Sequence, residues 1–86
     1  MFVVLAYDVQ AKRVGKALKI CRKYLCSVQE SVFEGHLTEA ELKRLKKELQ
    51  RLVDPERDSI RIYRMESVKY VSKEEIGISA AAQRII

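Results

Sequence analysis

FVVLAYDV, residues 2–9, is the stretch that decides how the rest of the chain folds. Residues 2–7 form an apolar run that does not alternate with polar residues, which predicts a strand buried on both faces. With 86 residues, the chain forms one domain, residues 1–86. A two-layer domain covers only one face of its sheet with helices. We therefore expect a second copy of the chain, in a homodimer, to cover the other face.

The apolar run ends in an acid, Asp8, and two interpretations of this residue are open. As a structural residue, Asp8 forms a turn or caps the helix that follows. As a functional residue, it binds Mg²⁺, which takes one or two carboxylates and fills its octahedron with waters and substrate phosphates. A two-fold dimer supplies the second carboxylate, because residues near the axis meet their own copies. Two facing carboxylates repel each other unless a cation or protons lie between them.

A helix is predicted over residues 11–25, with an apolar stripe on one face made of Val14, Leu18, Cys21 and Leu25. The opposite face carries a basic stripe at the same spacing: Lys12, Lys16, Lys19 and Lys23. No acid occurs between residues 11 and 24. A solvated helix face usually mixes both signs of charge, so two interpretations remain, a solvated face and a surface that contacts phosphates.

The rest of the chain predicts a second helix and further strands. Thr38 and Glu41 form a capping box, the helix behind it has a leucine stripe, and Asp54-Pro55 ends it. Strands are expected at 27–35, 57–65 and 68–71, which gives the order β-α-β-α-β-β. Segment 27–35 is either one bent strand or a very short hairpin. Residues 77–86 are a candidate strand that pairs outside its own protomer.

Composition narrows the class of partner. The net charge of +5 favours a polyanionic partner such as nucleic acid. The longest apolar run is too short to span a membrane and has no basic segment before it, so we expect no membrane contact and a cytoplasmic protein. Cys21 and Cys26 have neither redox-motif nor zinc-knuckle spacing, which favours two buried, reduced thiols.

Four segments together give the sequence a resemblance to a known family. They are a first strand ending in Tyr7-Asp8, a basic helix with Arg13-Val14, VQESVFEG at 28–35 and RIYRM at 61–65. With chain length and element order, these segments make residues 1–72 similar to the small CRISPR-associated adaptation proteins, the non-integrase partners of the CRISPR integrase. That family is also described as a metal-dependent endoribonuclease.

The resemblance implies an α+β protomer, a ferredoxin-like two-layer sandwich. Its antiparallel sheet has two helices on one face and forms the dimer through the other. Asp8 is then the catalytic residue and the Mg²⁺ ligand, and Arg13 is a phosphate-binding position. Tyr7, Ser31 and Phe33 flank the site. The C-terminal residues 77–86 are then the strand exchanged between protomers.

Two functions from different classes follow, and the sequence leaves both open. The first is hydrolysis of a phosphodiester in RNA or DNA, in which Mg²⁺ on Asp8 activates water and Arg13 stabilises charge on the phosphate. No general base is evident. The second is a structural dimer without catalytic activity, which bridges the CRISPR integrase and binds nucleic acid during spacer acquisition. An unrelated ferredoxin-like metabolite-binding domain lacks any ligand motif in this sequence.

Overall fold

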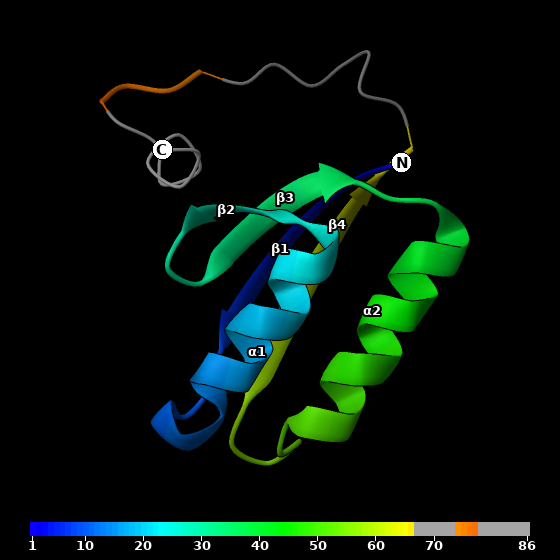
Figure 1. Ribbon diagram of the computed structural model, residues 1–86. Helices are drawn as coiled ribbons and strands as arrows, with labels where there is room; N and C mark the ends of the chain where they lie inside the picture. Colours follow the sequence, from blue (N-terminus) through cyan, green and yellow to red (C-terminus); the bar gives the residue numbers. More distant parts are fainter. Residues whose placement is uncertain (67–73, 78–86) are drawn as a thin grey trace.

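The computed structural model describes residues 1–66 and 74–77, and its centre is a four-stranded sheet with two helices on one face (Figure 1). The elements are β1 Phe2–Asp8, α1 Ala11–Tyr24, β2 Cys26–Gln29, β3 Val32–His36, α2 Glu39–Leu52 and β4 Ser59–Met65. The strands lie in the order β2-β3-β1-β4, and each neighbouring pair is antiparallel. This is a ferredoxin-like α+β fold, as the resemblance implied.

The predicted order of elements needs one correction. Segment 27–35 is a hairpin, because β2 ends at Gln29 and β3 begins at Val32. A register shift between Ser27 and Gln29 interrupts their pairing. The described order is therefore β-α-β-β-α-β. The strand predicted at 68–71, and residues 78–86 of the predicted last strand, lie outside the described residues.

β1 lies between β3 and β4, and its two faces differ. The face toward the helices is buried and carries Val3, Leu5 and Tyr7. The opposite face, which we call the open face, carries Phe2, Val4, Ala6 and Asp8. Paired residues of the neighbouring strands extend the open face: Val32, Glu34, His36, Ser59, Arg61, Tyr63 and Met65. The chain itself therefore buries one face of β1, and cover of the other by a second copy stays a prediction.

The predicted apolar stripe on α1 is largely confirmed, because Cys21 and Leu25 are buried and Leu18 packs against the core. The buried residues within α1 are Ala17 and Cys21, whose small side chains let the helix approach the sheet closely. Val14, which the stripe places in the core, is 38% exposed. Burial raises the pKa of the Cys21 thiol to about 12 and keeps it protonated. The prediction that Cys26 is buried is wrong, because this residue begins β2 opposite Glu34, on the open face.

α2 forms as the sequence predicts. The Thr38 hydroxyl accepts the backbone N–H of Glu41 at 3.1 Å, and the Glu41 carboxylate accepts the backbone N–H of Thr38 at 2.9 Å. Leu42, Leu45 and Leu49 are buried against the sheet. In the part of the chain that the structure describes, neither helix combines the length and the apolar character that crossing a bilayer requires.

Candidate functional site

Asp8 is the last residue of β1 and pairs with Ser59, the first residue of β4. Its side chain is exposed, and among residues 1–66 and 74–77 its carboxylate has no hydrogen-bond or ion-pair partner. The cap interpretation is wrong, because the N-cap of α1 is Gln10 and no side chain caps this helix. The carboxylate oxygens of Asp8 are therefore open to a ligand.

Two hollows in the surface meet at Asp8. The first lies on the open face and is also lined by Ala6, Ser59 and Arg61. The second lies between the start of α1 and the β2–β3 turn, where Val14 and Gly15 face Glu30 and Ser31. The Asp8 carboxylate is therefore accessible to a ligand from two sides.

The three residues predicted to flank the site support the end of β1. Tyr7 is buried, and its ring stacks on Phe33 with the ring centroids 5.8 Å apart. The Tyr7 hydroxyl donates to the carbonyl of Glu30 at 3.3 Å, and the Tyr7 backbone N–H donates to the carbonyl of Ser31 at 3.0 Å. These contacts tie the β2–β3 turn to β1. Phe33 is fully buried and supports the site from the core.

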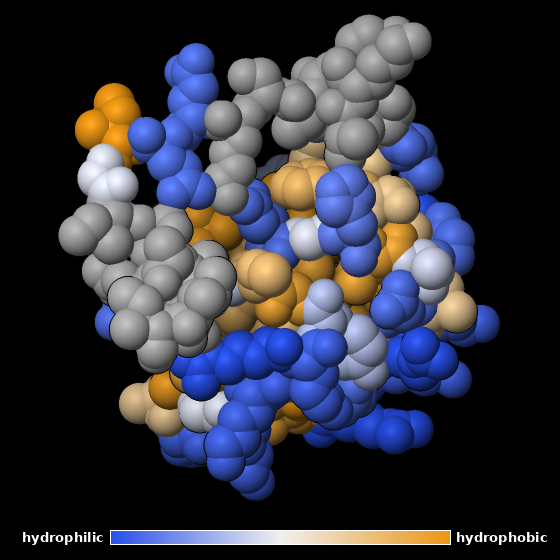
Figure 2. Space-filling model, turned by 45° about the horizontal axis from the view of Figure 1, so that its top comes forward, coloured by the Kyte–Doolittle hydropathy of each residue, from blue (hydrophilic) through white to orange (hydrophobic). Residues whose placement is uncertain are grey.

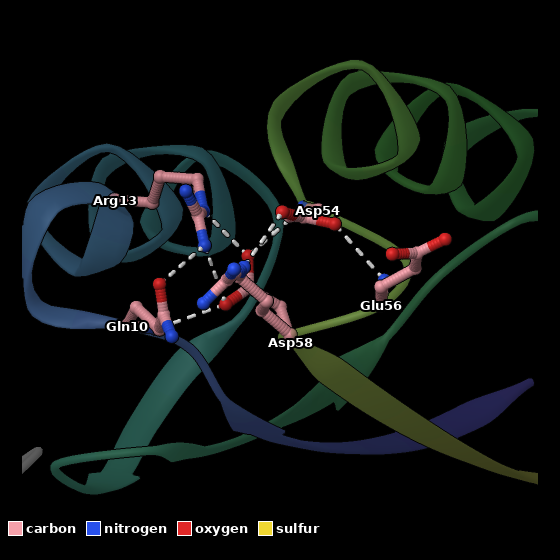
Figure 3. A network of polar contacts seen from close by, with 6 residues as sticks. Gln10, Arg13, Asp54, Glu56 and Asp58 are labelled. Atoms are coloured by element: carbon pink, nitrogen blue, oxygen red, sulfur yellow. Dashed lines mark hydrogen bonds and ion pairs between the residues drawn. The ribbon is translucent and has the colours of Figure 1, made fainter.

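Arg13 is held by a residue that the sequence did not reveal, Asp58. The Arg13 Nε donates to Oδ2 of Asp58 at 2.6 Å, and its Nη2 donates to Oδ1 at 3.0 Å (Figure 3). The same carboxylate accepts the backbone N–H of Gln10 and that of Asp54, each at 2.9 Å. The Asp58 side chain is 0% exposed and that of Arg13 is 15% exposed. Four donors therefore saturate a fully buried carboxylate.

The electrostatics of Asp58 follow from these contacts. Its hydrogen bond with Arg13 holds the pKa of the carboxyl well below its usual range, and the N–H groups of Gln10 and Asp54 lower it further. Burial acts in the opposite direction and is outweighed. The partners lie 45 positions apart in the sequence, and no motif marks them. The prediction that Arg13 contacts a phosphate stays a prediction.

The four lysines of the basic stripe are all exposed on α1. Lys23 pairs with Glu48 of α2, whose carboxylate also accepts the Tyr24 hydroxyl. Among the described residues, the other three have no ion-pair partner: Lys12, Lys16 and Lys19. On the face of the molecule shown in Figure 2, hydrophilic residues lie below and to the right of a central hydrophobic area. Contact between this stripe and phosphates remains a prediction.

The residues around Asp8 fit Mg²⁺ only in a site with few protein ligands. Within the described ranges, no three His, Cys, Asp or Glu side chains lie together as a metal-binding group. One protomer would therefore offer a metal ion the Asp8 carboxylate without two further acidic or imidazole ligands from the described residues. Mg²⁺ tolerates such a site, since it dehydrates reluctantly and keeps several waters.

The fold and the site define a class: ferredoxin-like α+β proteins in which a central strand ends in an aspartate, unpaired within the described residues, beside a basic helix. The family model described as CRISPR associated protein Cas2 matches residues 1–73. The chain belongs to this Cas2 family.

Relatives and solved structures agree with this assignment. A protein of Thermotoga maritima named CRISPR-associated endoribonuclease Cas2 is 49% identical over 78 residues, covering 91% of this chain and 90% of the relative. A Pyrococcus furiosus protein of the same name is 42% identical, with coverage of 91% and 89%. A crystal structure described as cas2 has a TM-score of 0.81 at 36% identity, covering 94% and 91%. Streptococcus pyogenes Cas2 has a TM-score of 0.75 at 34% identity, covering 90% and 100%.

Proposed function

We propose that the chain is a CRISPR-associated endoribonuclease, whose two-fold dimer holds Mg²⁺ between its two Asp8 carboxylates. The observation that carries this proposal is Asp8 itself, an exposed carboxylate without a partner among the described residues, at the end of a central strand. The names of the Thermotoga and Pyrococcus relatives support RNA cleavage as the reaction.

The open face supports the dimer. Phe2, Val4 and Ala6 lie on it only partly buried, and Tyr63 of β4 is 55% exposed. Burying this apolar area against its own copy removes it from water, which favours association. An isologous contact between two open faces places equivalent residues near the axis, and Asp8 lies on this face.

Different residues of the chain then have separate roles in binding and cleaving the RNA. Bound Mg²⁺ supplies an activated water and polarises the scissile phosphate. Asp8 binds the ion, and the basic stripe attracts the phosphate backbone. In Arg13 the Nη1 nitrogen makes no hydrogen bond within the described part of the chain, so it is available to donate to a phosphate oxygen. Tyr7, Ser31 and Phe33 keep the end of β1 in place.

The same dimer serves a second function in our proposal, as a bridge for the CRISPR integrase during spacer acquisition in the cytoplasm. The exposed lysines of α1 favour it, because they can bind the DNA backbone without any cleavage. The free thiols of Cys21 and Cys26 are consistent with a reducing compartment.

Asp8→Asn tests the nuclease. The variant keeps the shape of the side chain and removes its charge, so Mg²⁺-dependent cleavage of RNA should fall by about 100-fold or more. The dimer and its Tm should be unchanged or slightly higher without metal, because the repulsion between carboxylates is gone. Removal of Mg²⁺ with EDTA should have the same effect on the wild type.

Glu30→Gln is the matched control, since Glu30 is an exposed carboxylate that lines the same hollow. It should cleave RNA at nearly the wild-type rate. Full cleavage by Asp8→Asn, or its failure to fold, would show that Asp8 is structural. Co-purification of this variant with the integrase, without cleavage, would support the bridging function alone.

A further inference from the structure

We infer that Asp58 is a positioning residue for Asp8, which fixes the end of β1 through Gln10 and Arg13. The inference rests on the proposed function of Asp8 as a metal ligand. It assigns a role in metal binding to a buried carboxylate that does not itself touch the metal.

Asp8 depends on its backbone for its position. Its carboxylate is exposed and has no partner among the described residues, so no side-chain contact there orients it. On the N-terminal side, the Tyr7 N–H is bound to the Ser31 carbonyl at 3.0 Å. On the C-terminal side, the Gln10 N–H is bound to Oδ1 of Asp58 at 2.9 Å. The contact with Asp58 thus restrains the chain two residues after the metal ligand.

Asp58 also lies beside the pairing partner of Asp8. Asp8 is paired with Ser59 across the β1–β4 ladder, and Asp58 directly precedes Ser59 in the chain. Its carboxylate binds the β1–α1 connection through Gln10, α1 through Arg13 and the end of α2 through Asp54 (Figure 3). One carboxylate therefore joins the connection that follows Asp8 to α1 and to the segment that precedes β4.

The geometry of this contact is tightly defined. Arg13 binds Asp58 with two nitrogens, and such paired bonds fix orientation as well as distance. Removing the charge leaves buried donors without an acceptor, which forces the surrounding backbone to move. Residues that orient a metal ligand without binding the metal themselves typically change metal affinity by about 10-fold to 100-fold.

Glu48 offers a matched comparison within the same chain. Its carboxylate accepts from Lys23 and Tyr24 and so joins α1 to α2. Its contacts are with the two helices and none of them is with β1 or β4. Loss of a carboxylate contact at Glu48 therefore perturbs the fold without acting on the end of β1.

The test uses the full-length dimer and compares Asp58→Asn with Glu48→Gln. We expect Asp58→Asn to raise the Mg²⁺ concentration at half-maximal RNA cleavage by about 10-fold or more. Glu48→Gln should leave the Mg²⁺ requirement unchanged. An unchanged requirement in Asp58→Asn, or the same shift in both variants, would overturn the inference.

A second pair of variants covers the case in which Asp58→Asn does not fold. Gln10 has a φ of −61°, the value that proline fixes, so Gln10→Pro deletes its N–H with little demand on its own φ. Gln10→Ala removes the same side chain and keeps the N–H. Only Gln10→Pro should raise the Mg²⁺ requirement, and equal values for the two variants would contradict the positioning role.

Mn²⁺ binding, followed by electron paramagnetic resonance, separates this inference from the proposed function. If the wild type does not cleave RNA, the nuclease is excluded, while Mn²⁺ affinity in the same variants still tests positioning. Asp8→Asn should abolish the bound Mn²⁺ signal, and Gln10→Pro should weaken it relative to Gln10→Ala. A Mn²⁺ signal that survives in Asp8→Asn would overturn the positioning role, since Asp8 would then not be the ligand.

Discussion

β1 carries apolar residues on both of its faces, but the surroundings of the two faces differ. Val3, Leu5 and Tyr7 lie beneath the helices and are nearly or fully buried. Val4 and Ala6, on the other face, stay partly exposed, and Asp8 is exposed. Apolar character alone therefore does not tell a core face from the contact face of the proposed dimer, because both would exclude water.

The two aspartates at this end of the sheet differ in the same way. Asp58 is fully buried and its oxygens receive four N–H donors, whereas Asp8 is exposed and has no partner within the described residues. A saturated carboxylate stabilises the fold and has little capacity left for a ligand. An unsaturated carboxylate at a firmly held strand end is suited to bind one.

The largest effect on stability is expected on the covered face. Leu5→Ala should lower the free energy of unfolding by about 2–5 kcal/mol, because it leaves a cavity in a fully buried layer. Urea denaturation at one fixed protein concentration measures it. Val4→Ala, on the open face, is the control and should cost clearly less. Equal losses for the two variants would contradict the distinction between the faces.

A charge on the open face should act on association instead of folding. Val4→Lys is expected to raise the dissociation constant of the proposed dimer by at least about 100-fold, since it places an unpaired charge in an apolar contact. Sedimentation at micromolar concentration measures it, with circular dichroism to confirm the fold. Gln50→Lys adds the same charge on the exposed side of α2 and should stay dimeric. A dimeric Val4→Lys would place the contact elsewhere.

Low pH should destabilise the protein by protonating the buried carboxylate of Asp58. The pKa of Asp58 is lower in the folded chain than its ordinary value of 3.8, so its contribution to stability is complete above that value and is lost as the pH falls toward the folded pKa. The Tm should therefore decline below about pH 4. In Asp58→Asn the acid decline should be shallower, although the Tm at neutral pH is lower. An identical decline in both proteins would mean that other carboxylates control acid unfolding.

The smallest effect on folding is expected from the basic stripe. Replacing Lys12, Lys16, Lys19 and Lys23 by Gln should leave the fold intact and reduce the salt dependence of duplex binding by up to about 0.9 log units per lost contact. The matched control removes four charges from α2 by changing Lys43, Arg44, Lys46 and Lys47 to Gln. Equal changes in the two variants would indicate a diffuse charge effect instead of a binding face.

Much of the fold is readable in the sequence. The capping box at Thr38 and the leucine spacing behind it define α2, because both depend on residues within a few positions of each other. In β4, alternation separates Ile60 and Ile62 from Arg61 and Tyr63, as the pairing with β1 shows. The sequence also marks Asp8 as a candidate, because it ends a buried strand at a point where loops gather ligands and substrates.

Other features were missed for physical reasons. The exposure of Val14 follows from how α1 rotates onto the sheet, and small residues such as Ala17 decide that rotation without standing out in an apolar stripe. For segment 27–35 the sequence left a bent strand and a hairpin both open, and periodicity does not reveal the register shift within it. In the sequence, nothing distinguishes Asp58 from any other acid that precedes a strand.

The sequence by itself determined both helices, β1, β4 and the acid that ends β1, since local spacing and composition specify these. Only the tertiary structure decided which face of β1 is covered and which partner Arg13 receives. The reason is that the pairing of β1 with β4 brings Asp58 to the start of α1, across 45 positions of chain. Contacts that depend on strand register and helix packing have no local signal, because many distant residues determine them together.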